Sequence, residues 1–257
     1  MDRWKGRVAL VTGASAGIGY AIADALARSG MVVIGCARNT EKILELSKKY
    51  GKGAGSLEAI QCDLSQPDQI TAMFQQITKK HKQVDVLVNN AGLLRMDDLL
   101  TGRIEKWREM LEVNVLGLSI CAREALKLMP QDGNIININS YVGHFHTNFK
   151  GSHFYTGTKH MITSLTESLH REVRAMEPKN NIRITDISPG VVETEIMQRS
   201  LADAPQATDI STMPSRSWEY EKLKGQDIAD SVLYVLSAPQ HVNVKTLIVA
   251  PTQQPEL

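Results

Sequence analysis

A glycine-rich turn between an apolar run and a helical pattern is the feature that most constrains the fold of this chain. The apolar run Val8–Val11 precedes Thr-Gly-Ala-Ser-Ala-Gly-Ile-Gly at residues 12–19, and a helical pattern continues from Tyr20 to Ser29. This order lets backbone N–H groups approach a pyrophosphate at a helix N-terminus, where the helix dipole favours an anion. We therefore expect a nucleotide-binding turn; an ordinary strand-to-helix turn with three glycines is the alternative.

Strand-like and helix-like segments alternate along the whole chain. The expected strands are 7–12, 31–37, 57–62, 84–88, 133–139, 182–187 and 245–250, and the expected helices are 17–29, 40–50, 67–81, 104–129, 154–176 and 226–237. Such alternation predicts an α/β fold, a Rossmann-type doubly wound, mostly parallel seven-stranded sheet with helices on both faces. We expect one domain over residues 1–257, with an irregular substrate flap at about 191–224.

Composition narrows the class of protein. The chain has 257 residues, 42% of them hydrophobic, and a net charge of +1, so it can form a large core and gives no electrostatic reason to bind nucleic acid or an anionic membrane. It contains no run of 18 apolar residues and no apolar leader at its N-terminus. Cys36, Cys62 and Cys121 are dispersed in apolar surroundings, as buried thiols of a reducing compartment are. We expect a cytoplasmic protein without a membrane span or a metal site.

A tyrosine and a lysine lie four residues apart in Tyr155-Thr-Gly-Thr-Lys159, downstream of the serine that closes the apolar run Ile135–Ser140. In a helix these two side chains lie one turn apart on the same face. A free tyrosine has a pKa near ~10, and a nearby lysine cation lowers that pKa by stabilising the phenolate. The pair could therefore give and take a proton near neutral pH. A solvated helix face is the alternative interpretation of this spacing alone.

Six motifs in one order connect these features. They are Thr12-Gly-x-x-x-Gly-x-Gly19, Asn89-Asn-Ala-Gly92, Asn114, Ser140, Tyr155-x-x-x-Lys159 and Pro189-Gly190. In order and spacing the chain resembles the single-domain branch of the short-chain dehydrogenase/reductase family, from about Trp4 to about Pro251. Segments such as Gly35–Arg38, Cys62–Leu64 and Ile187–Thr194 are similar to a narrower group, which includes insect proteins described as farnesol dehydrogenases.

The resemblance implies hydride transfer between the nicotinamide of a bound cofactor and a carbonyl or carbinol carbon. Tyr155 would exchange the proton, Ser140 would hold the substrate oxygen, and Lys159 would bond the nicotinamide ribose and lower the pKa of Tyr155. The backbone carbonyl of Asn114 would hold a water that links Lys159 to solvent. A buried amide that kinks the helix is the alternative for Asn114. Gly157 stands where many relatives carry alanine, and it would loosen this helix or admit a closer neighbour.

The end of the second expected strand bears on the choice of cofactor. Gly35-Cys-Ala-Arg38 carries no carboxylate there to bond the ribose hydroxyls, and a guanidinium follows. Arg38 can pair with a 2′-phosphate through charge-assisted bonds, which favours NADP(H) over NAD(H). A surface arginine that pairs with Glu41 is the alternative. By resemblance Asp63 bonds the adenine amino group, whereas on chemistry alone it could cap the next helix.

The resemblance and the motifs together assign residues to two parts of one site. We expect the cofactor to contact Gly13, Ser15, Gly17, Ile18, Gly19, Arg38, Asp63, Leu64, Asn89, Ala91, Gly92, Tyr155, Lys159, Pro189, Gly190, Val192 and Thr194. We expect the substrate to contact Ser140, Val142, His144, Phe154, Tyr155, Val191, Ile196 and Met197. This second lining is largely apolar and suits a lipophilic alcohol or ketone.

The sequence thus predicts an NADP(H)-dependent oxidoreductase acting on a lipophilic alcohol or carbonyl substrate. The resemblance suggests farnesol or another isoprenoid alcohol. A hydroxysteroid dehydrogenase or ketosteroid reductase and a general carbonyl reductase are alternatives, and a non-catalytic NADP(H)-binding sensor is a third. Relatives pair through the helices expected at 104–129 and 154–176, which carry apolar positions on more than one side, so we expect a homodimer or homotetramer.

Overall fold

The computed structural model describes residues 1–52, 55–147, 149–176, 180–204 and 220–255. Its strands are β1 (Val8–Thr12), β2 (Val32–Ala37), β3 (Ser56–Gln61), β4 (Val86–Asn89), β5 (Asn134–Ile138), β6 (Arg183–Pro189) and β7 (Thr246–Val249). Its α-helices are α1 (Gly17–Arg28), α2 (Glu41–Ser47), α3 (Pro67–His81), α4 (Ile104–Met110), α5 (Leu118–Leu126), α6 (His153–Ala175), α7 (Glu195–Ala202) and α8 (Gly225–Ser237). All seven predicted strands are present within a few residues of their expected bounds.

The strands form one sheet in the order β3-β2-β1-β4-β5-β6-β7, and every neighbouring pair is parallel. The predicted fold is confirmed, and the sheet is wholly rather than mostly parallel. The strand order reverses between β1 and β4, so the connections that leave these two strands diverge to opposite faces. In open parallel sheets such a reversal opens a crevice at the carboxyl ends of the strands.

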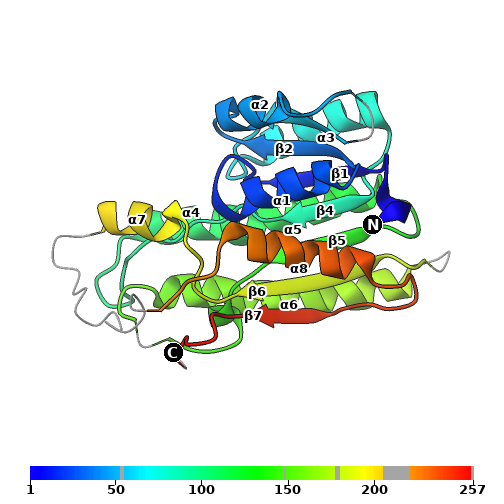
Figure 1. The fold of residues 1–257 in the computed structure, drawn as a ribbon. Coiled ribbons are helices and arrows are strands. Elements are labelled where there is room, and N and C mark those ends of the chain that lie inside the picture. The colour runs from blue at the N-terminus through cyan, green and yellow to red at the C-terminus, as the bar shows by residue number, and fades with distance from the viewer. Residues whose placement is uncertain (53–54, 148, 177–179, 205–219, 256–257) are drawn as a thin grey trace.

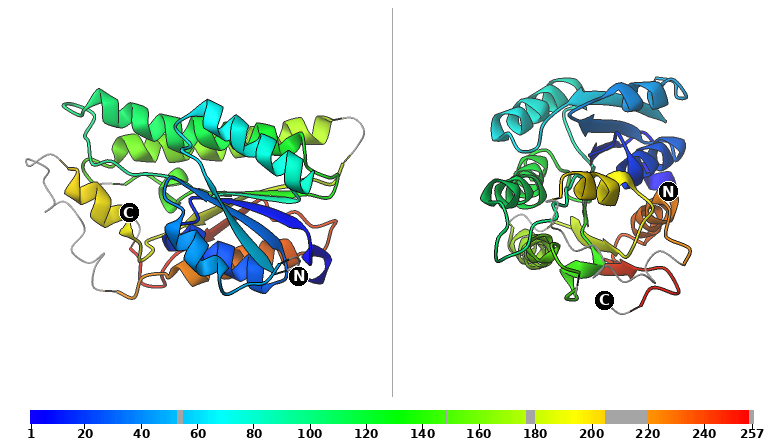
Figure 2. Two further views of the ribbon diagram at one scale, coloured as in Figure 1. Left: turned by 90° about the horizontal axis from the view of Figure 1, so that it is seen from above. Right: turned by 90° about the vertical axis from the view of Figure 1, so that its left-hand side faces the viewer.

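Helices cover both faces of the sheet (Figures 1 and 2). On one face α1, α2 and α8 pack on a core that includes Val11, Ile22 and Val232. On the other face α3, α5 and α6 pack on a core that includes Leu10, Ile70 and Cys121. The sheet is buried from both sides, which explains why β1 consists of five buried residues without alternation. The three cysteines are free and buried, as predicted.

The single helix expected over 104–129 is instead three successive segments. Between α4 and α5, residues Leu111–Gly117 form a π-helical segment. Two contacts favour this local change. The Asn114 side chain reaches sideways to the backbone of Leu93, and a Cβ at Gly117 would lie 2.6 Å from the carbonyl oxygen of Leu64. Segments of this type are often found at functional sites.

The expected flap is partly described. α7 lies beyond the carboxyl ends of the strands (Figure 1), and its approach is held by a parallel bridge between Val192 and Leu223. The Glu193 backbone N–H donates to the Leu223 carbonyl at 2.7 Å. Residues 205–219 of the expected flap, 191–224, lie outside the described residues. No helix in the described part of the chain is long and apolar enough to cross a membrane.

Candidate active site

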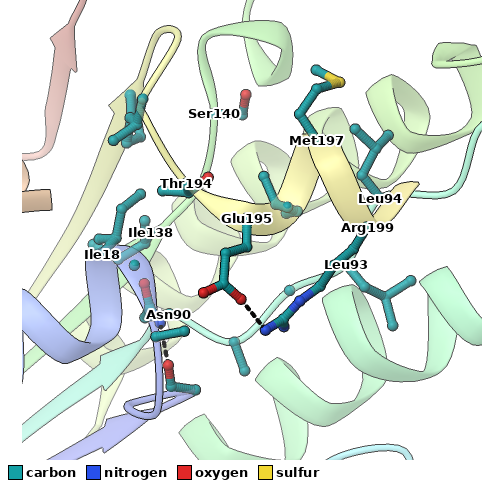
Figure 3. A pocket seen from close by; sticks show the side chains of 18 of the residues that line it. Ile18, Asn90, Leu93, Leu94, Ile138, Ser140, Thr194, Glu195, Met197 and Arg199 are labelled. Atoms are coloured by element: carbon teal, nitrogen blue, oxygen red, sulfur yellow. Dashed lines mark hydrogen bonds and ion pairs between the residues drawn. The ribbon is translucent and has the colours of Figure 1, made fainter. Parts of the chain in front are cut away.

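A cavity of about 850 Å³ opens at the carboxyl ends of the strands, over the reversal between β1 and β4. Figure 3 shows it from close by, with Ile18 and Asn90 on one side and Met197 and Leu94 on another. The predicted cofactor residues that line it are Gly13, Ser15, Gly17, Ile18, Arg38, Asp63, Leu64, Ala91, Gly92, Tyr155, Lys159, Pro189, Gly190, Val192 and Thr194. Nearly all the residues predicted to contact a cofactor therefore line one cavity.

The glycine-rich turn has the backbone that such a site needs. Gly13 and Gly17 have φ values of +67° and +54°, in the left-handed region that favours glycine. A Cβ at Gly13 would also lie 2.9 Å from the Cα of Ala91. Ala16, the residue that precedes α1, provides no side-chain cap, so the first N–H groups of α1 remain available to an anion.

Two predicted cofactor residues, Gly19 and Asn89, are not among the residues that line the cavity. A Cβ at Gly19 would lie 2.3 Å from the Nδ2 atom of Asn90. That amide donates to the carbonyl oxygens of Thr12 at 2.9 Å and Gly13 at 3.3 Å. Gly19 therefore makes room for a side chain that braces the turn. Asn90, which lines the cavity, was missed because its neighbour Asn89 is an equally good candidate in sequence.

Asn89 instead connects the strands below the cavity. Its Nδ2 atom donates to Oδ1 of Asn137 at 3.0 Å, which joins β4 to β5, and also to the Leu118 carbonyl at 3.4 Å. Asn137 in turn donates to the hydroxyl of Thr166 at 2.9 Å, on α6. Asn89 therefore braces the sheet next to the cavity, and its side chain does not line the cavity as predicted.

Arg38 lines the cavity at the end of β2 and is exposed. The alternative pairing with Glu41 is absent, because Asn39 occupies that carboxylate: Asn39 Nδ2 lies 3.4 Å from Glu41 Oε2, and Asn39 Oδ1 accepts from the Glu41 N–H at 2.9 Å. Among the described residues no carboxylate forms an ion pair with Arg38. Gln61 fixes its backbone by donating to the Arg38 carbonyl at 3.0 Å. Within the part of the chain that the structure describes, the Arg38 side chain thus lines the cavity without a carboxylate partner.

Asp63 also lines the cavity, after the end of β3. Its Oδ1 atom accepts from the Ser65 N–H at 3.0 Å and from the Ser65 hydroxyl at 2.9 Å. The residue that precedes α3 is Gln66, so the helix-cap alternative for Asp63 is wrong. Its carboxylate is oriented by a local turn beside the cavity.

Ser140, Tyr155 and Lys159 line the same cavity. Ser140 precedes the 3-10 turn Tyr141–Gly143, and its Oγ atom accepts from the Val142 N–H at 3.4 Å. Burial raises the pKa of the Tyr155 phenol to about 12, and a hydrogen bond with the Ser140 side chain offsets part of that increase. Ser140 and Tyr155 are thus close enough to share one substrate oxygen.

Lys159 is buried beneath Tyr155. Burial lowers the pKa of its ammonium to about 8, and the negative charge of Asp186 opposes that decrease. The ammonium donates to the Ile138 carbonyl at 3.2 Å and lies over the Tyr155 ring, 5.7 Å from its centroid. It is not among the groups that lower the pKa of the phenol in this structure. The lowering of the Tyr155 pKa by Lys159 that the sequence predicted is therefore absent, and burial raises this pKa instead.

Asn114 lies behind these residues and does not line the cavity. Its side chain accepts from the Leu93 N–H at 2.8 Å and donates to the Leu93 carbonyl at 2.9 Å. It also donates to the Thr158 hydroxyl at 3.2 Å, on α6 between Tyr155 and Lys159. As a side chain Asn114 is a fully bonded core amide. These side-chain bonds do not test the prediction that the Asn114 backbone carbonyl holds a water, which stays a prediction.

The residues predicted to contact the substrate line the cavity only in part. Ser140, Val142, Tyr155, Val191, Ile196 and Met197 line it as expected, together with Leu93, Leu94 and Phe149. Leu94, Met96 and Phe149 form a buried cluster against which Met197 and Leu201 of α7 pack. The end of β4 and the segment before α6 therefore contribute apolar groups for which the sequence offered no periodic signal.

Two expected substrate residues, His144 and Phe154, are not among the lining residues. The Phe154 ring stacks on Trp107 of α4, with 5.0 Å between centroids and 5° between planes. The Nε2 atom of His144 lies 2.9 Å from the Ser188 hydroxyl. Both side chains have partners on neighbouring elements, which draw them away from the cavity.

Ion pairs hold both ends of α7 next to the cavity. At its start Glu195 pairs with Arg199, as Figure 3 shows, and with Lys42 of α2 at 3.6 Å. At its end Asp203 pairs with Lys106 at 3.2 Å and Arg95 at 3.5 Å. The described part of the flap is thus tied to both sides of the crevice.

The comparisons with known proteins agree with this geometry. Residues 7–205 match the family model described as short chain dehydrogenase. Dehydrogenase/reductase SDR family member 11 of Gallus gallus is 46% identical over 260 residues, which cover 99% of each chain. Farnesol dehydrogenase of Aedes aegypti is 43% identical over 256 residues, which cover 98% of each chain.

Solved structures give the same result. The closed form of serine dehydrogenase complexed with NADP+ superposes with a TM-score of 0.83 at 29% identity, over 96% of both chains. The family model alone covers more than half of this chain, and the resemblance inferred from the motifs, including the similarity to insect farnesol dehydrogenases, is confirmed. The chain belongs to the short-chain dehydrogenase/reductase family of oxidoreductases.

Proposed function

We propose that this protein is an NADP(H)-dependent oxidoreductase that interconverts a lipophilic alcohol, such as farnesol or another isoprenoid alcohol, and its aldehyde or ketone. The observation that carries the proposal is the meeting of Ser140, Tyr155 and Lys159 at one cavity, beside an uncapped helix N-terminus. This combination supplies a proton donor, an oxygen-binding hydroxyl and a cation next to an anion-binding turn.

The cavity fits a dinucleotide. The left-handed glycines Gly13 and Gly17 leave space for a pyrophosphate, and Thr194 lies against Gly17, 3.2 Å from the position of an added Cβ. Asp63 and Leu64 would border the adenine, and Pro189 and Gly190 would border the nicotinamide. When bound there, the cofactor supplies or accepts the hydride of the reaction.

The residues of the chain would then manage the substrate oxygen and its proton. Tyr155 would donate the proton to a carbonyl oxygen or remove it from a hydroxyl, with Ser140 holding that oxygen in place. Lys159 would bond the ribose and keep a positive charge near the phenol. The Asn114 backbone carbonyl would hold a water that connects Lys159 to solvent.

Arg38 supports NADP(H) as the preferred cofactor. Its guanidinium is exposed at the adenosine end of the cavity, and Glu41 is paired with Asn39. A 2′-phosphate would supply the missing anion through charge-assisted hydrogen bonds. The related serine dehydrogenase is described as complexed with NADP+, which agrees with this preference.

The apolar lining supports a lipophilic substrate. Val142, Phe149, Val191 and Met197 line the cavity together with Ser140. The relative from Aedes aegypti is named farnesol dehydrogenase, which favours an isoprenoid alcohol within this class. A hydroxysteroid or ketosteroid would meet the same apolar lining, so a steroid dehydrogenase or carbonyl reductase is the second candidate.

We also propose that the protein forms a homodimer or homotetramer through α4, the π-helical segment, α5 and α6. Leu111, Leu116 and Met161 are large apolar side chains exposed along these elements. Light scattering after gel filtration would give twice or four times the mass of the chain, 28.4 kDa. A monomer at micromolar concentration would refute the proposed association.

The substrate and cofactor are tested together by absorbance at 340 nm. Purified protein would be given farnesol or a hydroxysteroid, each with NADP⁺ and with NAD⁺. We expect turnover of farnesol with NADP⁺ and much less with NAD⁺. Turnover of the steroid alone would favour the second candidate. Tight NADPH binding without turnover of any substrate would favour a non-catalytic NADP(H)-binding sensor.

A further inference from the structure

A buried carboxylate lies directly behind the candidate catalytic residues. Asp186 is in the middle of β6 and is 2% exposed. Its Oδ2 atom accepts from Asn139 Nδ2 at 2.8 Å, and its Oδ1 atom accepts from the Ser188 hydroxyl at 2.5 Å. His144 Nε2 lies 2.9 Å from that hydroxyl and 3.7 Å from Asp186 Oδ1.

Each of these partners is next to a residue of the site. Asn139 precedes Ser140, which holds the substrate oxygen in the proposed function. Ser188 precedes Pro189, which would border the nicotinamide. The Asp186 carboxylate thus links the residue before Ser140, at the end of β5, to the residue before Pro189, at the end of β6.

The same network reaches α6 and the turn after β5. Asn139 Nδ2 also donates to the Thr163 hydroxyl at 2.8 Å, and that hydroxyl donates to the Gly143 carbonyl at 2.9 Å. A Cβ at Gly143 would lie 2.6 Å from Asn139 Nδ2, so the turn packs directly on this amide. Four elements around the proposed reaction centre therefore share one set of hydrogen bonds.

The charge of Asp186 faces few other charged groups among the described residues. On α6 its charge acts on Lys159, and in the turn after β5 the neighbouring titratable group is His144, 3.7 Å away. The neighbours of Asp186 on β5 and β7 are Asn137 and Thr246, which do not titrate. Lys159 is therefore the buried cation on which the charge of Asp186 acts.

We propose that Asp186 is a positioning residue of this site, which fixes the strand ends that carry Ser140 and Pro189 and keeps Lys159 in its charged form. The inference rests on the proposed function for its catalytic consequence. Burial alone disfavours the ammonium of Lys159, and Asp186 is the charge that opposes this lowering of its pKa. Without Asp186, Lys159 would lose its proton at a lower pH and would no longer keep a positive charge near the phenol of Tyr155.

The test compares Asp186→Asn with Ser188→Ala and Thr185→Val. The first removes the charge and keeps the shape, and the second removes one hydrogen bond and keeps the charge. Thr185 is a fully buried neighbour on β6 whose hydroxyl has no hydrogen-bond partner among the described residues, so it is the matched control.

The first measurement does not depend on activity. Lysine labelled with ¹³C at Cε would be titrated by NMR, with the Lys159 signal assigned by its loss in Lys159→Met. We expect the Lys159 midpoint to fall by about one pH unit in Asp186→Asn and to be unchanged in Ser188→Ala and Thr185→Val. An unchanged midpoint in Asp186→Asn would overturn the proposal, even if no substrate were turned over by the wild type.

The second measurement is the pH profile of kcat and KM for alcohol oxidation. We expect about a tenfold lower kcat in Asp186→Asn, an acid limb moved to higher pH and a KM for NADP⁺ within about twofold of wild type. Ser188→Ala should lower kcat by a smaller factor with its pH profile in place. Superimposable profiles with reduced thermal stability alone would show a purely structural role.

The proposal can still be tested if Asp186→Asn fails to fold. Asp186→Ser, which also removes the charge but leaves a small hydroxyl, would replace Asp186→Asn in both measurements. If neither folded, Ser188→Ala would decide: an unchanged kcat would overturn the positioning role, and a lowered kcat with wild-type stability would support it. A wild type without turnover would instead count against the proposed function.

Discussion

At the scale of single residues, the burial of Lys159 conflicts with the charged role proposed for it. Its ammonium is buried, and the pKa falls from 10.5 to about 8 in the fold. Methionine has a side chain of similar length but no charge. Lys159→Met should therefore raise the free energy of unfolding by about 1–3 kcal/mol at pH 7. Urea unfolding of the cofactor-free protein measures this, and NADPH oxidation should be abolished. A destabilised Lys159→Met would contradict the expected conflict.

The same residue gives a pH dependence whose sign can be worked out. Because the pKa of Lys159 is lower in the fold, the unfolded chain binds more protons between about pH 8 and 10.5. Wild-type stability should therefore rise with pH across that window relative to Lys159→Met, by on the order of 1 kcal/mol between pH 7 and 9. The buried cysteines contribute to stability with the opposite sign, because burial raises the pKa values of their thiols. Both proteins contain these cysteines, so comparing them at each pH cancels that contribution.

Two glycines provide an opposed pair of substitutions. A Cβ at Gly157 would meet nothing within 4 Å, so this glycine neither admits a closer neighbour nor avoids a clash. Gly157→Ala should stabilise the protein by up to about 1 kcal/mol with kcat unchanged. Gly19→Ala should instead destabilise it and weaken NADPH binding, because the new Cβ would displace Asn90. Thermal melts measure the stability of the two variants, and NADPH fluorescence measures their affinity for NADPH. Equal effects of the two substitutions would contradict this prediction.

Arg38 carries the prediction on cofactor choice. Arg38→Leu removes the cation available to a 2′-phosphate and should reduce the preference for NADPH over NADH by roughly 10–100-fold, since a hydrogen bond to a charged group contributes about 1.5–3 kcal/mol. The ratio of kcat/KM for the two cofactors measures it. Lys42→Leu, a nearby cation that pairs with Glu195, is the control and should leave the ratio nearly unchanged. Equal ratios in wild type and Arg38→Leu would exclude the proposed contact.

At the scale of elements, periodicity predicted where strands and helices lie but not how the helix over 104–129 is wound. The π-helical segment depends on contacts that Asn114 and Gly117 make with residues more than twenty positions away, and no local pattern encodes them. The same reason explains why His144 and Phe154 do not line the cavity. They were predicted to do so because they are close in sequence to Ser140 and Tyr155. Their partners Ser188 and Trp107 come from other elements and decide where they lie.

α7 provides a test at this scale. Asp203 is about one-third exposed and pairs with Lys106 and Arg95, so each pair contributes about 0.5 kcal/mol at most. Asp203→Asn should therefore raise the KM for the alcohol only about two- to fivefold and leave NADPH binding intact. High salt should reduce the difference from wild type. A loss of NADPH binding would show instead that Asp203 supports the whole crevice.

At the scale of the whole molecule, the order of motifs predicted more than any single motif could. The glycine turn, Arg38, Asp63 and the catalytic pair are far apart in sequence, and a parallel sheet brings the carboxyl ends of their strands to one edge. That rule predicted the cavity. It did not predict Asp186, because an acidic residue inside an apolar strand carries no sequence signal for the partners that satisfy it.

Tyr155→Phe tests whether Tyr155 transfers the proton in the proposed reaction at this cavity. The variant removes one hydroxyl and leaves the ring, so NADPH should bind with nearly wild-type affinity by fluorescence titration. Oxidation of farnesol with NADP⁺, followed at 340 nm, should fall by a factor of about 10²–10⁴. Wild-type turnover by Tyr155→Phe would contradict this role of Tyr155, because the proton would then have to come from another group.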